Sequence, residues 1–216
     1  MSQTTDSSAE VWTAASLAAC FGAIPLDRVW THPVPGEATE EDVVDICEHR
    51  DRLCELIDGV LVEKTVGYLE SWLGLRFARL LGQYVDEHDL GIVLGADGLT
   101  RLRPGQIRIP DAAFISWDRI PDRYLPQQPF WERGLDLAIE IISRYNTPQE
   151  MDRKLADYFD AGVRAVWYVY PKSREVLAYS SPTECVKFQE GDILDGAPVL
   201  PGFTLPLSML FGLPGK

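Results

Sequence analysis

The sequence predicts an α/β domain in which helices flank a mixed β-sheet and additional antiparallel strands follow. Three observations support this fold class. Residues 135–170 contain two apolar, strand-like runs separated by a helix, which is typical of a parallel crossover. Two further strand-like runs meet at Asp58-Gly59, the strongest short signal for an antiparallel hairpin. Residues 67–87 carry apolar side chains mostly at helical spacing, which predicts a long amphipathic helix packed across a sheet.

The length and composition indicate one domain. A chain of 216 residues can bury one substantial core, whereas two compact domains would be cramped. We expect residues 1–35 to form a lead-in that is partly disordered or loosely docked, and residues 36–216 to form the domain. No stretch approaches the roughly 18 apolar residues of a membrane span, and the N-terminus lacks the pattern of a secretory signal. We therefore expect a cytoplasmic protein with no membrane partner.

The charge and the cysteines limit the function further. With 20 basic and 33 acidic residues the net charge is −13, which repels DNA at long range. Two interpretations of Arg101, Arg103 and Arg108 stay open: a local basic surface, or a solvated strand face. The four cysteines form no CxxC pair and there are only three histidines, so a structural zinc site has weak support.

The first half of the domain is expected to alternate helices and strands. Its elements are, in chain order, an acidic helix after the N-cap Thr39, strands 52–57 and 60–63, helix 67–87, strand 91–94, and strands 99–103 and 106–115 around Pro104-Gly105. The loop 117–134 follows.

The second half begins with a strand at residues 135–142. Thr147, Pro148 and Glu150 then suit the N-cap, N1 and N3 positions of a helix, and Gly162 suits a left-handed C-terminal cap. A buried strand is expected at residues 165–170. Antiparallel strands are expected within residues 175–188 and 193–203.

A glutamate stands inside the most apolar of these strands. Residues 135–142 run Leu-Asp-Leu-Ala-Ile-Glu-Ile-Ile, which is typical of a central strand buried on both faces, and the glutamate is Glu140. A carboxylate there loses hydration worth several kcal/mol, so we expect a metal ion, a cation or a proton beside it. The main alternative for Glu140 is a structural salt bridge, for example to Arg164.

Asp111 and Lys154 are expected to join Glu140 at one site. Strand alternation places Asp111 on the same face as Ile109, and Lys154 projects near the edge of its helix's apolar stripe, from where it can reach the sheet. Mg²⁺ prefers carboxylate oxygens and keeps several waters, and a lysine beside it can orient the attacking water or offset charge on a phosphate. The alternatives are a turn cap after Pro110 for Asp111 and a solvated helix position for Lys154.

Six short motifs occur in a fixed order along the chain. They are Glu-Leu-Ile-Asp-Gly (55–59), Ile-Pro-Asp-Ala-Ala-Phe-Ile (109–115), Asp-Leu-Ala-Ile-Glu-Ile-Ile-Ser (136–143), Asp-Arg-Lys-Leu-Ala-Asp-Tyr (152–158), Ala-Gly-Val-Arg-Ala-Val-Trp-Tyr-Val-Tyr-Pro (161–171) and Leu-Pro-Gly-Phe (200–203). Together they resemble the Uma-two family of bacterial restriction endonuclease-like proteins, part of the PD-(D/E)XK nuclease superfamily. The resemblance spans roughly residues 38–213.

This resemblance implies a restriction-endonuclease-like core and Mg²⁺- or Mn²⁺-dependent hydrolysis of phosphodiester bonds in nucleic acid, with DNA as the expected substrate. Asp111 matches the acid of the Pro-Asp motif and Glu140 the second acid, so both are expected to bind the metal. Glu55 matches an early glutamate that can join them. The superfamily lysine would stand at Ile142, and in this family its role is carried by Lys154.

Two departures from the family pattern leave other functions open. Ser143-Arg144 replaces the usual Ser-Pro, and no histidine occurs near Tyr68 at the start of the long helix. One alternative is a catalytically inactive interaction module that keeps the nuclease fold, and another is hydrolysis of a non-nucleic phosphate ester. The oligomeric state does not follow from the sequence, although a homodimer is compatible with it because endonuclease-like domains often pair to cut two strands.

Overall fold

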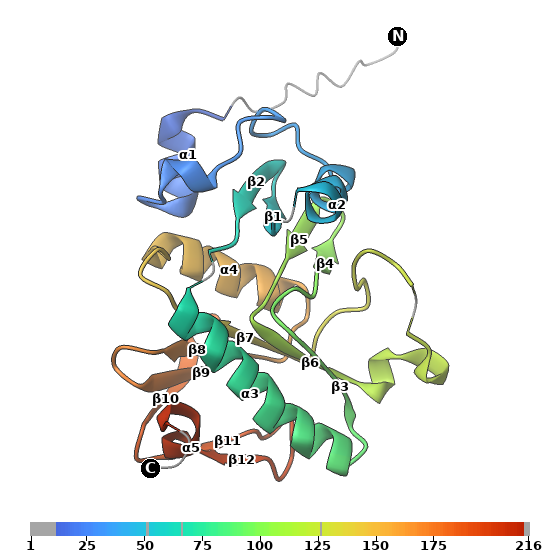
Figure 1. Cartoon of the computed structure of the whole chain (residues 1–216), viewed down its shortest axis with the longest axis vertical. Helices are drawn as coiled ribbons and strands as arrows, with labels where there is room; N and C mark the ends of the chain where they lie inside the picture. Colours follow the sequence, from blue (N-terminus) through green and yellow to red (C-terminus); the bar gives the residue numbers. More distant parts are fainter. Residues whose placement is uncertain (1–11, 51, 66, 126, 214–216) are drawn as a thin grey trace.

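A computed structural model describes residues 12–50, 52–65, 67–125 and 127–213 (Figure 1). It contains a six-stranded sheet, a four-stranded sheet and a two-stranded sheet, with helices packed around them. The helices are α1 (Ala14–Phe21), α2 (Glu40–His49), α3 (Tyr68–Glu87), α4 (Pro148–Asp160) and α5 (Leu207–Phe211). The α/β class predicted from the sequence is confirmed.

The six-stranded sheet is mixed and has the order β10-β9-β8-β7-β6-β3. Its strands are β3 (Gly91–Leu94), β6 (Ala112–Ser116), β7 (Leu137–Ile141), β8 (Ala165–Tyr170), β9 (Glu175–Ser181) and β10 (Glu184–Gln189). Only β7 and β8 pair in parallel, and α4 connects them, so the predicted strand-helix-strand unit is confirmed. Thr147 caps α4 in a capping box with Glu150, and Gly162 has the predicted positive φ of 79°.

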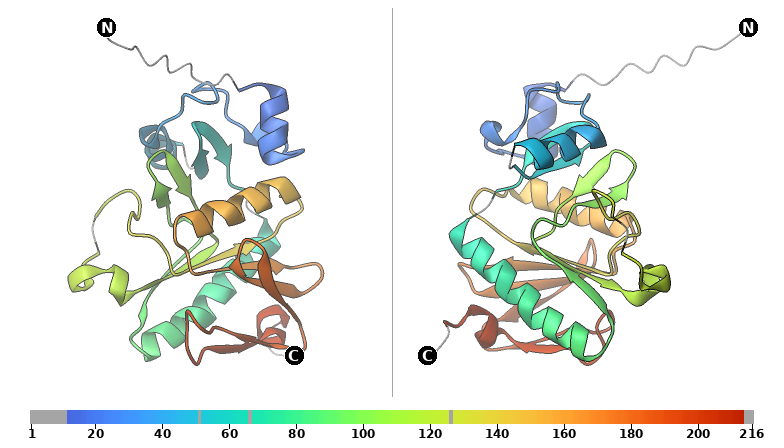
Figure 2. Two further views of the ribbon diagram at one scale, coloured as in Figure 1. Left: turned by 180° about the vertical axis from the view of Figure 1, so that it is seen from behind. Right: turned by 45° about the vertical axis from the view of Figure 1, so that its right-hand side comes forward.

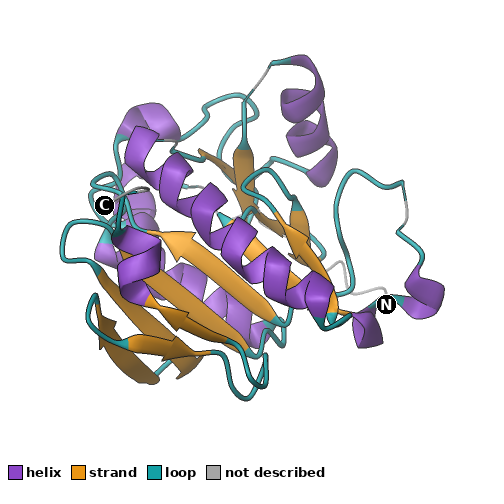
Figure 3. Ribbon diagram, turned by 60° about the horizontal axis from the view of Figure 1, so that its bottom comes forward, coloured by secondary structure: helices purple, strands orange, loops and turns teal. Residues whose placement is uncertain are grey.

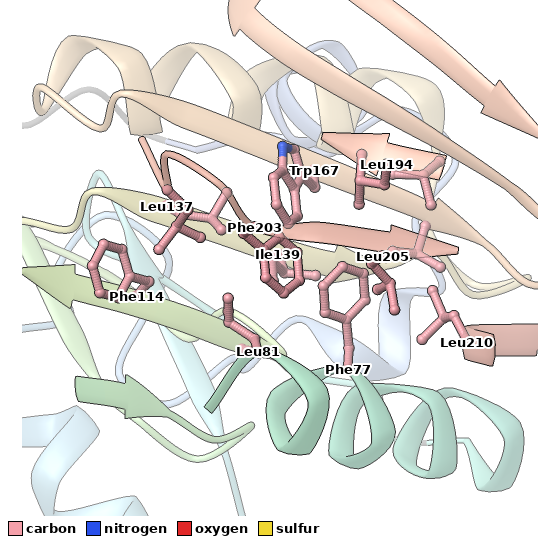
Figure 4. Packing of buried hydrophobic residues seen from close by; sticks show 14 of the residues in the cluster. Phe77, Leu81, Phe114, Leu137, Ile139, Trp167, Leu194, Phe203, Leu205 and Leu210 are labelled. Atoms are coloured by element: carbon pink, nitrogen blue, oxygen red, sulfur yellow. The ribbon is translucent and has the colours of Figure 1, made fainter. Parts of the chain in front are cut away.

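Helix α3 crosses one face of this sheet (Figure 3). Its side chains Phe77 and Leu81 are fully buried and pack with Trp167 of β8 and with the C-terminal segment (Figure 4). That segment comprises β11 (Ile193–Asp195), β12 (Thr204–Pro206) and α5. None of the helices in the described part of the chain combines the length and apolar character needed to cross a bilayer.

Helix α4 packs on the opposite face of the same sheet. Met151, Leu155 and Tyr158 of the helix contact Ala138 of β7 and Val166 of β8 in a second apolar cluster. Because successive side chains of a strand point to opposite faces, β7 supplies residues to the clusters on both sides. The residues of β7 that face α4 include Glu140.

The N-terminal segment and the four-stranded sheet form a layer beside α4 (Figure 2). This sheet has the order β2-β1-β5-β4, with strands β1 (Cys54–Ile57), β2 (Val60–Glu63), β4 (Thr100–Arg103) and β5 (Gln106–Arg108). Phe21, Ile24 and Val29 are buried against Ile57 and Val62, so within residues 12–35 the lead-in packs on this sheet. Residues 1–11 of the expected lead-in lie outside the described residues, and the division of the chain at residue 35 remains a prediction.

The structure confirms one hairpin and corrects one strand. β1 and β2 are joined through Asp58 and Gly59, whose φ values of 49° and 76° are those that such a two-residue turn requires. The single strand predicted for residues 106–115 is wrong, because the chain leaves the small sheet after Arg108 and enters the large sheet at Ala112. Proline at position 110 has no N–H to donate, which favours the break there.

Candidate active site

Asp111 lies beside Glu140 because two backbone hydrogen bonds attach it to β7. Its N–H donates to the carbonyl oxygen of Ile139 (2.9 Å), and its carboxylate Oδ2 accepts from the N–H of Ile141 (2.7 Å). These bonds lie on either side of Glu140 in the sequence. The bond to Ile141 joins residues 30 apart, so the carboxylate does not cap a local turn.

Lys154 joins Glu140 to Glu55. Its Nζ lies 2.9 Å from Oε1 of Glu140 and 2.9 Å from Oε1 of Glu55, and all three side chains are buried. The prediction that Lys154 reaches back to the sheet is confirmed. Burial lowers the pKa of Lys154, but the two carboxylates outweigh this effect and raise it above its usual value, so the side chain carries a full positive charge.

Glu55 is held in its ionised form by a second buried cation. Arg108 Nη1 lies 2.8 Å from Oε2 of Glu55, and Arg108 also pairs with Asp157 of α4. The Arg108 side chain is 0% exposed. Burial alone would raise the pKa of Glu55, but Lys154 and Arg108 lower it to about 2. Arg108 is therefore neither part of a basic surface nor on a solvated strand face, and both interpretations are wrong. It lies in the interior, where it pairs with the carboxylates of Glu55 and Asp157.

The net shift of the pKa is opposite at Glu140. Burial raises the pKa of the Glu140 carboxyl to about 7 despite Lys154, and the negative charges of Asp111 and Glu55 add to the rise. The Tyr158 hydroxyl donates to the same Oε1 that faces Lys154 (2.6 Å). Within the described residues, no hydrogen bond is formed by Oε2. A positive charge added next to this carboxylate would therefore be stabilised.

A second lysine, Lys64, contacts the other acid. It follows β2, and its Nζ lies 2.9 Å from Oδ1 of Asp111. The same ammonium donates to the carbonyl oxygens of Ile109 (2.8 Å) and Ala96 (2.9 Å). Lys64 thus fixes both the carboxylate and the chain segment that carries it.

A small cavity of about 20 Å³ opens among these groups. Its lining includes all four predicted residues, Glu55, Asp111, Glu140 and Lys154, together with Lys64 and Glu70. This volume holds about one water or one ion. Among the described residues, no group of three or more His, Cys, Asp or Glu side chains is arranged to bind a metal. Two carboxylates still fit Mg²⁺, because that ion keeps several of its waters and prefers oxygen donors.

Three other arginines have acidic partners that the sequence did not indicate. Arg164 pairs with Asp136 (3.6 Å), so a salt bridge from Glu140 to Arg164 is wrong. Arg101 forms an ion pair with Glu40, and Arg103 forms one with Asp58, so each arginine has an acidic partner within the protein.

Three residues of the site were missed by sequence reasoning. Arg108 carried a usable signal, because it is a charged residue between Ile107 and Ile109, as Glu140 is within its own apolar strand. Tyr158 stands at the end of a motif in a predicted helix, and nothing in the sequence indicates that its hydroxyl contacts Glu140. Lys64 stands after a strand with no pattern that distinguishes it from a solvated lysine.

The fold resembles that of a solved structure. It is described as a "putative nuclease belonging to DUF820 from Anabaena variabilis ATCC 29413", and it superposes with a TM-score of 0.65 over 74% of this chain and 90% of that chain. The two sequences are 16% identical, so the likeness establishes the fold alone. No curated protein matches the chain.

The sequence comparison assigns the family. Residues 40–208 match Uma2, described as "Putative restriction endonuclease". This match covers most of the chain and includes Glu55, Asp111, Glu140 and Lys154. The chain therefore belongs to the Uma2 family, and the resemblance recognised in its motifs is confirmed. The family's description supports a nuclease.

Proposed function

We propose that this protein is a metal-dependent endonuclease that hydrolyses phosphodiester bonds in DNA. The observation that carries the proposal is the shared cavity: Asp111 and Glu140, from separate segments, line one small space together with Lys154 and Glu55. Carboxylates with a buried lysine at a site of this size suit hydrolysis of a phosphate ester.

Asp111 and Glu140 would hold a single Mg²⁺ or Mn²⁺ ion. The free Oε2 of Glu140 and the remaining lone pairs of the Asp111 carboxylate are the available donors. When bound, the ion supplies Lewis acidity to a phosphate oxygen and acidifies nearby water.

Lys154 acts as a cation in this proposal. Two carboxylates at 2.9 Å keep its ammonium protonated, so it orients the attacking water by hydrogen bonding or offsets negative charge that develops on the phosphate. Glu55 positions Lys154, and Arg108 positions Glu55. Tyr158 fixes the rotamer of Glu140 through its hydroxyl hydrogen bond.

The experiment is a cleavage assay of the purified protein on single- and double-stranded DNA with Mg²⁺ or Mn²⁺. We expect Asp111→Asn and Glu140→Gln to lower the cleavage rate at least about 100-fold. Loss of a residue that only hydrogen-bonds to a metal ligand already lowers metal affinity or activity by up to about that factor. Glu184→Gln, at an exposed acid of β10, is the matched control and should cleave like the wild type. Equal cleavage by all four proteins would refute the proposal.

A second candidate is a catalytically inactive interaction module. It is favoured by the ion pairs Lys64–Asp111 and Lys154–Glu140, which neutralise both acids without a metal, and by the net charge of −13. Calorimetric titration with Mn²⁺ separates the two functions. Binding heat that disappears in Asp111→Asn supports the nuclease, whereas the absence of metal binding supports the module.

A further inference from the structure

A larger hollow of about 580 Å³ adjoins the candidate site. It is lined by the first turn of α3, the turn after β7 and the segment after β8, and the residues that matter here are Tyr68, Glu70, Arg144, Tyr145 and Lys172. Glu70 lines both this hollow and the small cavity that contains Asp111 and Glu140, so the two spaces meet at that side chain. A ligand in the hollow would end next to the proposed catalytic groups.

Two cationic side chains of the hollow have no acidic partner in the part of the chain that the structure describes. Within the described ranges, neither Arg144 nor Lys172 forms an ion pair with a carboxylate. In contrast, Lys64, Lys154 and Arg28 each do so around the small cavity. In a chain of net charge −13, cations without acidic partners are the sites at which a phosphate backbone can be bound.

The same hollow presents aromatic rings to solvent. Tyr68 is 90% exposed and Tyr145 is 41% exposed. The guanidinium of Arg144 lies 4.6 Å from the centre of the Tyr145 ring and bonds to its hydroxyl. Exposed aromatic rings beside cations are the arrangement on which proteins stack the bases of single strands.

The turn that carries Arg144 and Tyr145 is firmly attached to the site. The Ser143 N–H donates to the side-chain oxygen of Asn146 (2.9 Å), and Arg28 donates to the carbonyl oxygen of Tyr145 (3.1 Å). This turn directly connects β7, which carries Glu140, to α4, which carries Lys154. A base stacked on Tyr145 is therefore held at a fixed position relative to both groups.

We propose that the hollow binds unpaired nucleotides of a nucleic acid strand, and hence that the substrate is single-stranded next to the cleaved bond. Bases stack on Tyr68 and Tyr145 while phosphates contact Arg144 and Lys172. The inference rests on the proposed nuclease function. Two cations without an acidic partner among the described residues suit one or two phosphates, fewer than the about 6–10 contacts of a protein whose DNA binding is strongly salt-dependent. The volume is that of a small-ligand pocket, about 300–1,000 Å³, which suits a nucleotide.

The test is fluorescence anisotropy with a labelled oligothymidylate strand, the matching RNA strand and a blunt duplex, all in EDTA so that no cleavage occurs. We expect both single strands to bind more tightly than the duplex. Tyr68→Ala and Tyr145→Ala should each weaken single-strand binding at least about fivefold, as loss of one stacked base does. Tyr145→Phe keeps the ring and should bind like the wild type.

A salt titration examines the two cations separately. Lys172→Ala and Arg144→Ala should each reduce the slope of log affinity against log salt by about 0.7, the value for one phosphate contact in a single strand. Tyr124→Ala and Arg79→Ala are matched controls at exposed positions outside the hollow, and neither should change affinity or slope.

The inference is overturned if the duplex binds as tightly as the single strands, or if the hollow variants bind like the controls. These outcomes are distinct from failure of the proposed function. If cleavage requires Asp111 and Glu140 but is unaffected in Tyr68→Ala, the nuclease function stands and nucleotide binding in the hollow is refuted. If single-strand binding requires Tyr68 and Tyr145 but no metal supports cleavage, nucleotide binding in the hollow stands and the nuclease function is refuted.

Discussion

The same strands form both faces of the six-stranded sheet, but the two faces bury different kinds of side chain. On the α3 face, Phe77 and Trp167 pack in a wholly apolar cluster. On the α4 face, apolar packing surrounds the charged groups Glu140 and Lys154. The apolar face depends on packing volume, whereas the charged face depends on each buried charge having its partner. The first face therefore tolerates isosteric changes, and the second does not tolerate loss of a single partner.

The largest expected effect is on the charged side. Arg108→Met removes a fully buried guanidinium and leaves the carboxylates of Glu55 and Asp157 without it. Breaking a buried ion pair costs about 3–5 kcal/mol, and two carboxylates are affected here. Urea unfolding followed by circular dichroism measures the loss. A variant as stable as the wild type would mean that the carboxylates are neutral or solvated.

Phe77→Ala tests the apolar side with an effect of similar or slightly smaller size. A large-to-small substitution in a packed core costs about 3–5 kcal/mol, because the removed ring leaves a cavity. Leu75→Ala, on the solvent side of the same helix, is the control and should change stability by no more than about 0.5 kcal/mol. Equal effects of the two substitutions would show that α3 does not pack through Phe77.

A double-mutant cycle of Lys154→Met, Glu140→Leu and their combination compares pairing with packing at the site itself. Lys154→Met alone leaves Glu140 buried without its cation, whereas Lys154→Met combined with Glu140→Leu leaves no unpaired charge there, and Arg108 still holds Glu55. We expect the double variant to be more stable than the single one, with a coupling free energy of about 0.5–3 kcal/mol. The double variant should also be inactive in the cleavage assay. Additive stabilities would mean that the two side chains do not interact.

The last test is a pH dependence of stability, which involves a single carboxylate of the charged face. The folded-state pKa of Glu55, about 2, lies below its ordinary value of 4.5, so its contribution is present above pH 4.5 and is lost as the pH falls from 4.5 towards 2. Glu55→Gln cannot titrate, so its stability should change less over that window. Unfolding curves of both proteins between pH 5 and pH 2 measure the difference, and parallel losses of stability would contradict the assignment.

Local patterns in the sequence were sufficient for most elements of the fold. Capping residues located α2 and α4, and the apolar run around Glu140 located the central strand, because these signals depend on neighbours within one turn or one strand. The division of residues 106–115 between two sheets was not predicted, although Pro110 marked the position. A run of alternating residues fits either sheet, and only the packing of the two sheets decides where one pairing ends.

For the site, the sequence by itself determined that a carboxylate at Glu140 would be buried and need a partner. Its local patterns indicated Asp111 and Lys154 as the groups beside it, and the family resemblance added Glu55. The tertiary structure alone decided which charges neutralise each other: Lys64 with Asp111, and Arg108 between Glu55 and Asp157. The reason is physical. Burial follows from local composition, whereas an ion pair requires two side chains within about 4 Å, and strands far apart in the sequence reach that distance only after the layers have packed.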